Sequence, residues 1–436
     1  MSSTLVVGMF GYGVVGGGVV KLLEGDGRFK FKCVCVRDAN KPRDVPLPPG
    51  CKLTTNPKDI LEDSEIQLVV EVAGGVTAAK DITFTALEKG KHVVSANKAL
   101  ISAHLDDLVA LQAKAPKTYF MFEAAVCGGI PIISVFQRSL ACDKIMRVTG
   151  IMNGTTNYIL TKMRDEGLDY RVVLQDAKNK GYAEADESAD VEGWDARSKL
   201  CILAKLAFGI TVDEKKVFCQ GITQITSADF KYAEVLGKAV KHLGIAERTT
   251  GSDGKEKITI YLAPCLVPLK DALASVQSVT NAVEVVSSNL STSVYIGPGA
   301  GRLPTANSVV ADMMDLHAKS AGGTSSAPAQ PPFPSGASGI SGFESDFETA
   351  FYLRFLVNDK VGIIQKLAEA LASQHISIHS IQQTPIENPK RVPFVIITEK
   401  TKLSTVQSFM KSISGDNRRA YDFLVDDPFC MPFLEF

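Results

Sequence analysis

The stretch from Leu5 to Gly16 reads LVVGMFGYGVVG and decides the fold of the N-terminal part of the chain. It begins with a short apolar run, which is typical of a buried parallel strand. Glycines then follow with the GxGxxG spacing, and each has a physical role. Gly11 permits a tight turn, Gly13 lets backbone N–H groups approach a pyrophosphate, and Gly16 lets the next helix pack close to the strand.

The residues after this turn favour a dinucleotide-binding Rossmann unit. An apolar segment of helical character runs to Leu23, and a second strand is expected from Phe29 to Val36. The helix N-terminus would face the phosphates of a nucleotide with the positive end of its dipole. A chance glycine-rich turn is the alternative, but this one lies between a strand and a helix. We therefore expect cofactor contacts from the turn residues Gly11, Tyr12, Gly13, Val14, Val15 and Gly16.

The end of the second strand bears on the choice between the two nicotinamide cofactors. The strand runs into Arg37 and Asp38. An acidic side chain at this position accepts hydrogen bonds from a ribose 2′-hydroxyl, whereas an arginine can pair with a 2′-phosphate. Arg37 therefore favours NADP, and Asp38 leaves NAD open. The alternative for Arg37 is a solvated loop charge.

Three more apolar runs end in residues that suit a ligand site, and they span Ile66 to Val72, His92 to Ser95 and Tyr119 to Phe122. In doubly wound sheets, ligands bind at the carboxyl ends of the strands. Paired glycines follow the first run and would let a backbone pass close to the cofactor. A lysine follows the second run, although a surface lysine is an equal alternative there. The cofactor contacts expected from these ends are Gly74, Gly75, Ser95 and Lys98.

Composition excludes several classes of partner. The 436 residues carry a net charge of −1, which gives no electrostatic case for nucleic acid or an anionic membrane. No apolar run is long enough to span a bilayer, and the N-terminus has no secretory pattern. The nine cysteines are scattered and odd in number, which indicates reduced thiols in a cytoplasmic protein.

The stretch from Gly181 to Lys199 is rich in acidic residues and holds the only tryptophan. Asp195 and Lys199 are four residues apart and share one helix face. Apolar residues continue this face toward Leu206, so Lys199 lies on a buried stripe, where lysine is unusual. Burial would lower the pKa of Lys199, as an acid/base lysine requires. A surface ion pair is the alternative.

The remaining patterns divide the chain into further units. Alternating runs from Ile258 to Val267 and from Asn281 to Ser288 predict an open sheet with one covered face. Residues 319–346 are rich in Ser, Gly, Ala and Pro and indicate a flexible linker. From Phe347 the order strand, helix, strand, strand, helix, strand, with a last strand near Tyr421 to Val425, predicts a ferredoxin-like unit.

We therefore expect an α/β protein of three units. Residues 1–145 form a Rossmann-type doubly wound NAD(P)-binding sheet, and residues 146–318 form a second, α+β domain for substrate binding, catalysis and dimerisation. The final helix of that domain, about 304–318, is placed to pack back on the Rossmann sheet. Residues 347–436 form the ferredoxin-like unit. Because the linker shows no apolar periodicity, a chain ending near residue 318 is expected to fold independently.

Several motifs occur together that resemble homoserine dehydrogenases with a C-terminal ACT domain. The family pattern extends from Ala177 to Lys199, and it departs only at Glu187, where the family usually has proline. The segments Asn97-Lys98, Glu123 to Pro131, Asn153 to Thr155 and Gly297 to Thr305 also resemble family motifs. The resemblance covers nearly the whole chain outside the linker.

The resemblance implies reversible hydride transfer with NAD(P) between L-homoserine and L-aspartate 4-semialdehyde, in threonine, methionine and isoleucine biosynthesis. By similarity, Lys199 and Lys98 transfer the proton at the substrate oxygen, and Asp190 supports Lys199. An ammonium near a developing alkoxide suits this chemistry. By the same resemblance, Glu184 and Asp195 are the acids that hold the substrate ammonium. The further implied substrate contacts are Asp190, Gly154 and Thr155, and the implied additional cofactor contact is Gly301.

The resemblance also implies a cation and an effector. A monovalent cation, usually sodium in this family, would bind to Glu123 and to the backbone carbonyls of Val126, Gly128 and Ile130. The ACT unit would bind an amino acid, for which threonine feedback is the natural expectation, and the chain would form a homodimer or homotetramer. In the ACT unit, Val361 stands before Gly362 where proline is commonest.

Two alternatives remain open at this point. One is a dehydrogenase of the same fold that acts on another small amino alcohol. The other is a catalytically inactive amino-acid sensor that uses both modules for binding. The intact lysines and acids argue against the sensor, and a panel of substrates would separate the two dehydrogenases.

Overall fold

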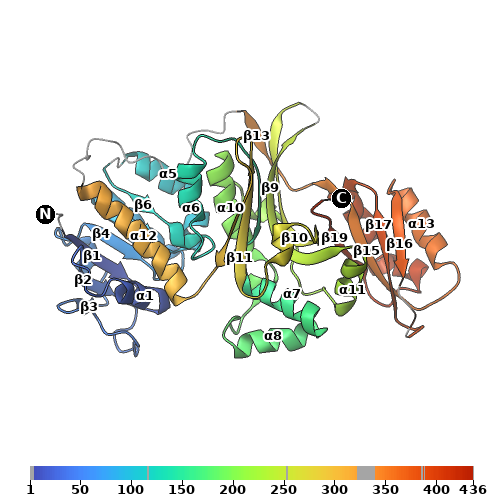
Figure 1. The fold of residues 1–436 in the computed structure, drawn as a ribbon, viewed down its shortest axis with the longest axis horizontal. Helices are drawn as coiled ribbons and strands as arrows, with labels where there is room; N and C mark the ends of the chain where they lie inside the picture. Colours follow the sequence, from blue (N-terminus) through green and yellow to red (C-terminus); the bar gives the residue numbers. More distant parts are fainter. Residues whose placement is uncertain are drawn as a thin grey trace.

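The protein consists of three sheet-based units in a row, with the N-terminal unit at one end and the C-terminal unit at the other (Figure 1). The computed structural model describes residues 4–114, 117–251, 254–321, 339–383, 386 and 388–435. No helix within these ranges has the length and apolar character needed to cross a membrane.

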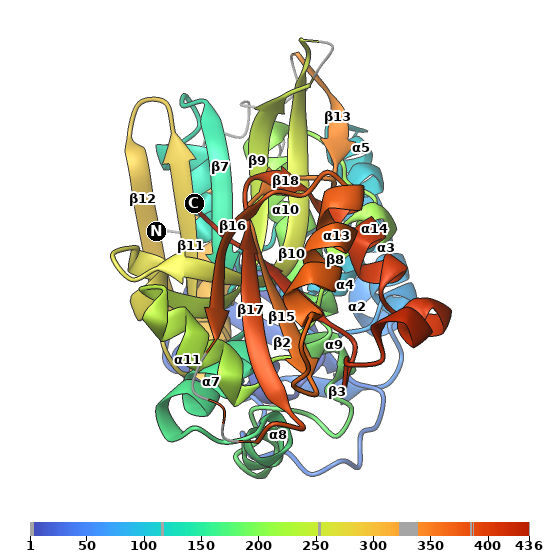
Figure 2. The ribbon, with the colours of Figure 1, turned by 90° about the vertical axis from the view of Figure 1, so that its right-hand side faces the viewer.

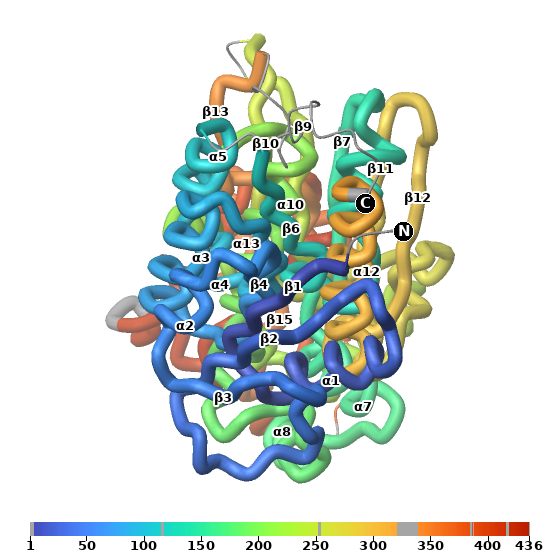
Figure 3. The backbone as a smooth tube through the Cα atoms, turned by 90° about the vertical axis from the view of Figure 1, so that its left-hand side faces the viewer, coloured from blue at the N-terminus to red at the C-terminus, as the bar shows by residue number. Residues whose placement is uncertain are grey.

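The first unit is a six-stranded parallel sheet with helices on both faces (Figure 3). Its strands, in spatial order, are β3 (Lys52–Thr54), β2 (Phe29–Cys35), β1 (Leu5–Phe10), β4 (Leu68–Glu71), β5 (His92–Ser95) and β6 (Phe120–Met121). The direction of connection reverses between β1 and β4, which is where doubly wound sheets bind ligands. Its helices are α1 (Val14–Leu22), α2 (Lys58–Leu61), α3 (Thr77–Glu88), α4 (Lys98–Ala103) and α5 (Leu105–Lys114).

The glycine turn has the close contacts that its spacing predicts. Gly11 has a φ of +93°, and a Cβ there would lie 2.6 Å from the carbonyl oxygen of Val72. A Cβ on Gly16 would lie 2.5 Å from the carbonyl oxygen of Gly11, so only glycine lets α1 sit this close to β1. A Cβ on Gly13 would meet no atom within 4 Å, which leaves the backbone there open to a ligand.

The second unit is built around a mixed sheet that α10 (Trp194–Phe208) covers on the side of the first unit (Figure 1). The order is β12 (Ser291–Pro298), β11 (Thr280–Ser287), β7 (Ile145–Ile151), β9 (Lys238–Thr250), β10 (Glu256–Pro268) and β13 (Ile340–Glu344), with β8 (Phe218–Cys219) also paired to β10. The two predicted alternating strands are confirmed as β10 and β11. The other helices are α6 (Ile132–Ser134), α7 (Gly154–Glu166), α8 (Tyr170–Asn179), α9 (Ser188–Val191) and α11 (Ser227–Val235).

Helix α12 (Arg302–Ala321) leaves the second unit and packs against α1 and the first sheet (Figures 1 and 3). Gly18 makes the approach of the two helices possible, because a Cβ there would lie 2.9 Å from the Cβ of Ala306. The apolar stripe of α12 joins the core of the first sheet through Ala306, Val309, Met313 and Leu316. The second unit is therefore fixed to the first by its own last helix.

The predicted linker, residues 319–346, extends too far in both directions, because residues at each end belong to a helix or a strand. Residues 319–321 continue α12, and Ile340–Glu344 form β13, which pairs in parallel with β10. Ile340 and Phe343 pack against the core that α10 and the central sheet share, which explains why this end is ordered. Residues 322–338 of the expected linker lie outside the described residues.

The third unit is a four-stranded antiparallel sheet with two helices on one face (Figure 2). Its elements run β15 (Phe351–Val357), α13 (Ile363–Ser373), β16 (Ile378–Gln383), β17 (Val392–Thr398), α14 (Leu403–Ser412) and β19 (Phe429–Pro432), which is the predicted ferredoxin-like order. A short pair, β14 (Glu348–Thr349) and β18 (Thr401–Lys402), lies beside it.

The last strand was predicted near Tyr421 to Val425, but it lies later in the chain, at Phe429–Pro432. The predicted segment makes only an isolated bridge between Leu424 and Val357, and β19 takes the place beside β15. Arg418 donates hydrogen bonds to the carbonyls of Leu424 and Val425, which folds the segment into a turn.

The third unit packs directly on the second through the sheet face that its helices leave uncovered (Figure 2). Tyr352, Val395 and Phe429 share a core with residues of α7, α8 and α11. Tethering by a flexible linker alone is therefore a wrong expectation. A chain ending near residue 318 would expose this apolar face to water, which argues against its independent folding.

A buried charge pair lies in the same contact. Asp229 of α11 is fully buried and forms an ion pair with Arg354 of β15, while the hydroxyl of Tyr352 donates to Asp229 Oδ1 over 2.8 Å. Thr226 completes the cluster by accepting a hydrogen bond from Arg354 over 2.6 Å. Burial raises the pKa of Asp229, so the carboxylate depends on these partners to stay charged.

Replacing Arg354 by methionine should lower the free energy of unfolding by about 3–5 kcal/mol, because the Asp229 charge would stay buried without its partner. Urea denaturation of the full chain measures this. The matched control is Arg391→Met, since Arg391 pairs with Asp426 on the surface and both side chains are mostly exposed. The control should change stability by less than about 1 kcal/mol. Equal effects of the two substitutions would contradict a stabilising role for the buried pair.

Candidate active site

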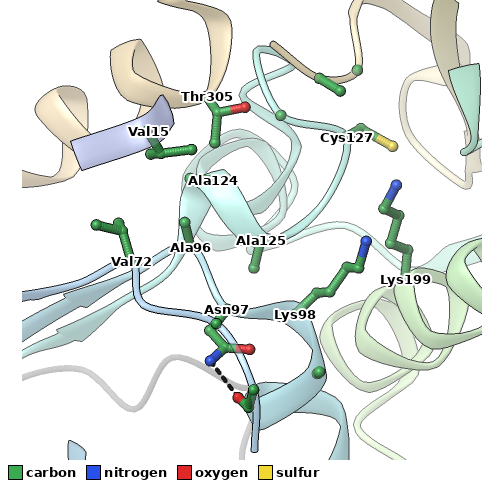
Figure 4. A pocket seen from close by; sticks show the side chains of 16 residues that line it. Val15, Val72, Ala96, Asn97, Lys98, Ala124, Ala125, Cys127, Lys199 and Thr305 are labelled. Carbon is green, nitrogen blue, oxygen red and sulfur yellow. Dashed lines mark hydrogen bonds between the residues drawn. The ribbon is translucent and has the colours of Figure 1, made fainter. Parts of the chain in front are cut away.

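A pocket of about 370 Å³ lies at the switch point of the first sheet, where the first and second units meet (Figure 4). The first unit contributes the loops after β4, β5 and β6, and the second contributes one lysine of α10 and the turn before α12. The lining residues are Val15, Val72, Gly74, Gly75, Ala96, Asn97, Lys98, Ala99, Ala124, Ala125, Cys127, Gly128, Lys199, Gly299, Ala300 and Thr305.

Two lysines and one aspartate meet at this pocket. Lys98 is the first residue of α4, and Lys199 lies one turn after Asp195 in α10. Lys199 Nζ donates to Asp195 Oδ2 over 2.8 Å and to the carbonyl oxygen of Met152 over 2.7 Å, while Lys98 forms an ion pair with Asp195 Oδ1. Figure 4 shows both lysine side chains directed toward the part of the pocket that Cys127 lines. One buried carboxylate thus holds two ammonium groups.

The electrostatics of this group correct one prediction. Burial, the largest single influence, would lower the pKa of Lys199, but the charge and hydrogen bond of Asp195 together with Cys127 and Asp190 outweigh it, so the pKa lies above the ordinary value. For Asp195, burial would raise the pKa, yet the charges of Lys199 and Lys98 hold it well below the ordinary value. The expected lowering of the Lys199 pKa is therefore wrong, because the sequence argument counted burial without the paired carboxylate.

Asp190 joins the group through Asn153, to which the sequence analysis assigned no role beyond its place in a family motif. Asn153 caps α7, and its Nδ2 donates to Asp190 Oδ1 over 2.6 Å and to Asp195 Oδ2 over 3.0 Å. Asp190 therefore forms no ion pair with Lys199 and supports it through the Asn153 amide and through its charge, which raises the pKa of Lys199. A cap residue directly before Gly154 and Thr155 was the available signal, but only the fold shows that its amide reaches both acids.

The other predicted substrate residues, Gly154, Thr155 and Glu184, do not line the pocket. Thr155 donates its hydroxyl hydrogen bond to the carbonyl oxygen of Tyr182 over 2.6 Å, and a Cβ on Gly154 would lie 2.7 Å from the carbonyl oxygen of Val279. Glu184 is exposed, does not line the pocket and makes no hydrogen bond or ion pair with the described residues. The structure thus does not bring Glu184 together with Lys98, Asp195 and Lys199.

On the cofactor side, the glycines line the pocket and the polar residues support it. Gly74 and Gly75 have φ values of +72° and +82° and form part of its wall. Ser95 is fully buried beneath it and donates to Glu71 Oε2 over 2.8 Å. Asn97 donates to the carbonyl oxygen of Gly75 over 2.7 Å and caps α4. Burial raises the pKa of Glu71.

The remaining predicted cofactor residues surround the turn. Val15 lines the pocket, Val14 is exposed, and the hydroxyl of Tyr12 donates to the carbonyl oxygen of Pro46 over 2.8 Å, which fixes the loop after β2. Arg37 is exposed at the end of β2 and forms no ion pair with the described residues. Gly301, with a φ of +114°, makes the turn into α12 next to the pocket wall.

The loop after Arg37 contains a second arginine that sequence reasoning missed. Arg43 donates from its guanidinium to the carbonyl oxygens of Asp38 and Ala39 over 2.6 and 3.0 Å. It therefore shapes the loop that follows β2. Its only signal in the sequence is its proximity to Arg37.

Glu123 lies behind the pocket among backbone donors. Its two carboxylate oxygens accept hydrogen bonds of 2.8 Å from the N–H groups of Ile133 and Ser134, at the start of α6. Its own N–H donates to Asp312 Oδ2 over 2.8 Å. Burial raises the pKa of both acids, and neither forms an ion pair with a described lysine or arginine.

The backbone carbonyls named with Glu123 lie on the same loop. The carbonyl oxygen of Gly128 accepts from Ser308 Oγ over 2.7 Å, and that of Ile130 accepts from the N–H of Ile132 over 2.8 Å. No hydrogen bond to the carbonyl oxygen of Val126 occurs among the described residues. Within the described part of the chain, no group of three or more His, Cys, Asp and Glu side chains is arranged to hold a metal.

Comparison with known families and proteins gives one consistent result. A family model described as homoserine dehydrogenase matches residues 131–314, and one described as the homoserine dehydrogenase NAD-binding domain matches residues 11–123. A third model, the ACT domain, matches residues 351–411.

Individual proteins agree over nearly the full length. A homoserine dehydrogenase of Bacillus subtilis is 37% identical over 420 residues, which cover 94% of each chain. One of Pseudomonas aeruginosa is 38% identical over 407 residues, covering 90% of this chain and 92% of that one. The crystal structure of a homoserine dehydrogenase from Thiobacillus denitrificans superposes with a TM-score of 0.88 at 33% identity, covering 99% of both chains.

Proposed function

Because the chain belongs to the homoserine dehydrogenase family, whose members are NAD(P)-dependent oxidoreductases, we propose that the pocket between the first sheet and α10 is its catalytic site. The chain interconverts L-homoserine and L-aspartate 4-semialdehyde. The observation that carries this placement is the meeting of Lys98, Asp195 and Lys199 at a pocket that the glycine turn also borders through Val15.

The nicotinamide cofactor, when bound, would accept the hydride from homoserine or deliver it to the semialdehyde. Lys199 is oriented for the oxygen of the reacting carbon. Two of its three N–H groups donate to Asp195 and to the carbonyl of Met152, so one stays available for the substrate. Because the raised pKa keeps Lys199 protonated, it stabilises the alkoxide charge that develops during reduction.

Lys98 has a different place in this arrangement. It lies on the second oxygen of Asp195, and its side chain is 43% exposed, whereas that of Lys199 is 10% exposed. A proton released from the homoserine hydroxyl needs a route out of the pocket, and Lys98 is the group able to exchange protons with water. We therefore assign charge stabilisation to Lys199 and proton exchange with solvent to Lys98.

By the resemblance, Glu184 and Asp195 would hold the substrate ammonium, with a third acid close to Asp195 at Asp190. One oxygen of this carboxylate accepts from Asn153, and the other accepts no hydrogen bond from the described residues. Asp195 also pairs with two lysines, so the second oxygen of Asp190 would add negative charge beside the ammonium. Glu184 would join it only after the loop between α8 and α9 moves toward the pocket.

We propose NADP as the preferred cofactor. Arg37 lies at the end of β2, is exposed and has no acidic partner among the described residues, so its guanidinium is available to a 2′-phosphate. The backbone at Gly13, Gly74 and Gly75 would take the pyrophosphate side, where glycines leave room for close approach.

A monovalent cation, with sodium as the first choice, would fit beside Glu123. Glu123 and Asp312 are buried and form no ion pair with the described residues, so a positive ion beside them would favour their charged forms. Carboxylate and carbonyl oxygens are the ligands that hard cations prefer, and Val126, Gly128 and Ile130 supply carbonyls on the same loop.

The ACT unit would bind an amino acid, with threonine as the first choice. A pocket of about 170 Å³ lies between β15 and α13 and is lined by Asp359, Lys360 and Gly362 among others. One acid and one base suit the two charges of an amino acid, and Gly362, with a φ of +91°, leaves the N-terminus of α13 open. An assembly of two or four chains stays a prediction.

Lys199→Ala should lower kcat for homoserine oxidation at least about 100-fold, because the group that acts on the substrate oxygen is removed. The KM for NADP should change little. Lys205→Ala, in the same helix but paired with Asp106 away from the pocket, is the matched control. Near-normal turnover of a folded Lys199→Ala variant would exclude this role.

Arg37→Ala should weaken NADP binding about 10-fold or more, in the range of a charge-assisted contact worth about 1.5–3 kcal/mol, and should leave NAD binding nearly unchanged. Steady-state oxidation of L-homoserine with each cofactor measures this. Arg28→Ala, an exposed arginine already paired with Asp26, is the control. Equal losses for both cofactors would mean that Arg37 serves folding or the shared part of the molecule.

Asp359→Ala should abolish inhibition by threonine and leave kcat unchanged, because coupling requires an occupied effector site. Threonine is titrated against the full-length variant and against Glu369→Ala, whose side chain lies on the same unit outside the pocket. Unchanged inhibition in Asp359→Ala would place the effector elsewhere. No inhibition of the unaltered chain would reject threonine as the effector.

A further inference from the structure

The side-chain amide of Asn97 joins two loops of the first sheet that border the pocket. Asn97 follows β5, is 6% exposed and lines the pocket itself. Its Nδ2 donates to the carbonyl oxygen of Gly75, in the loop after β4, over 2.7 Å, and this is the hydrogen bond drawn in Figure 4. Its Oδ1 accepts from the N–H of Leu100 over 3.1 Å and so caps α4, which begins at Lys98. One amide therefore contacts both the cofactor-side loop and the helix that carries Lys98.

The loop after β4 has little else to hold it. Gly74 and Gly75 have left-handed backbones, and a Cβ built on either would meet no atom within 4 Å. Among the described residues, neither glycine takes part in a backbone–backbone hydrogen bond, and α3 begins beyond them without a side-chain cap. In that same part of the chain, the carbonyl oxygen of Gly75 accepts from Asn97 alone. The shape of this loop therefore depends on the Asn97 amide.

The amide of Asn97 is itself fixed by the residues next to it. Its main-chain N–H donates to Ser95 Oγ over 3.1 Å, and Ser95 donates to Glu71 Oε2 over 2.8 Å. Glu71 ends β4, is fully buried, and accepts through Oε1 from the N–H of Ala73 over 3.0 Å and from Asn97 Nδ2 over 3.5 Å. The side-chain amide thus has a partner for its oxygen and for both N–H groups, which leaves it one orientation.

We propose that Asn97 is a positioning residue, which holds the Gly74–Gly75 loop in the shape that receives the nicotinamide cofactor and fixes that loop relative to Lys98. The inference rests on the proposed function of the pocket as the catalytic site. Lys98 reaches Asp195 from the first residue of α4, so the cap of this helix and the position of the ammonium group are linked. Because the same amide binds the loop, one side chain places the cofactor side and the proton-exchanging lysine together.

The two ends of the amide have separable effects. Nδ2 holds the loop, so without this donor the loop has to be ordered when the cofactor binds, and the entropy cost weakens binding. Oδ1 caps α4, so its loss frees the first turn of the helix and the lysine in it. Removing the donor alone should therefore weaken cofactor binding, whereas removing the cap as well should also lower turnover.

Three substitutions at this position separate the two ends. Serine and aspartate both cap helices well, so Asn97→Ser and Asn97→Asp keep an acceptor for the N–H of Leu100 and remove the donor to Gly75. Asn97→Asp also brings a second carboxylate beside Glu71, and like charges repel, so its effect on the loop should be the larger. Asn97→Ala removes both the donor and the cap.

The first measurement is NADPH binding to the full chain, followed by the fluorescence of the reduced nicotinamide ring with no homoserine present. The dissociation constant of Asn97→Ser should rise about 10-fold, as expected for the loss of a hydrogen bond that orders the site, and that of Asn97→Asp should rise further. The melting temperature of Asn97→Ser should stay near that of the unaltered chain, because the cap is kept.

The matched control is Asn56→Ser. Asn56 lies in the same unit at the start of α2, where its side chain donates to Asp59 over 3.2 Å and accepts from the N–H of Lys58 over 3.2 Å. It does not line the pocket, so the same substitution there should leave the dissociation constant of NADPH unchanged.

The second measurement is steady-state oxidation of L-homoserine with NADP. In Asn97→Ser, the KM for NADP should rise while kcat and the KM for homoserine stay within about twofold, because Lys98 keeps its place on Asp195. In Asn97→Ala, kcat should also fall at least about 10-fold, because the lysine that exchanges protons is displaced.

Each other outcome has a distinct meaning. A cap-only role predicts that Asn97→Ser and Asn97→Asp bind NADPH like the unaltered chain and that only Asn97→Ala loses stability and turnover, which would overturn the proposal. Equal losses of NADPH affinity in Asn97→Ser and Asn56→Ser would also overturn it, because they would show a general effect on the first sheet. An unaltered chain that binds NADPH but does not oxidise homoserine would instead reject the proposed function, whereas the NADPH titrations test the hold of Asn97 on the loop independently.

Discussion

The proposed catalytic site depends on one buried carboxylate. Asp195 is nearly enclosed, and a carboxylate in that position stays ionised only because Lys98 and Lys199 contact its two oxygens. Lys98 belongs to the first unit and Lys199 to the second, so the same charge also ties the nucleotide sheet to the helix that covers the central sheet. Loss of this carboxylate would leave two ammonium groups facing each other across the pocket.

The contact between the first and second units is possible because glycines let neighbouring segments pack closely. The first sheet presents its strand ends to the second unit because Gly16 lets α1 pack on β1 and Gly18 lets α12 pack on α1. Gly299 brings the turn before α12 to the pocket wall, where a Cβ would overlap the side chain of Asn281. The pocket is thus bounded by backbone on the nucleotide side and by charged side chains on the substrate side.

Much of this was predictable from local pattern, and the failures have identifiable physical causes. The glycine turn, the strand ends, the family and the lysine on an apolar helix face follow from spacing and periodicity, and all are confirmed. The direction of the Lys199 pKa could not be predicted, because it depends on the distance to Asp195. The link that the Asn153 amide makes between Asp190 and Asp195 depends on a corner at Gly193, between α9 and α10, that no periodicity encodes. The packing of the third unit depends on an interface with no sequence signal, since β15 is buried on both faces.

That interface explains how an effector in the ACT unit could act on catalysis without a long path. The chain between α9 and α11 contacts both the residue next to Asp190 and the sheet of the ACT unit. The carbonyl oxygen of Val191, next to Asp190, accepts from the N–H of Ile222 over 2.9 Å. Within the same stretch, the side chain of Gln220 donates to the carbonyl oxygen of Cys430 in β19 over 3.0 Å, and Arg354 of β15 donates to that of Gln224 over 3.0 Å. A ligand that shifted the ACT sheet would therefore also shift the segment that holds α9, and a preference of that ligand for one position of the sheet would become a preference for one position of Asp190.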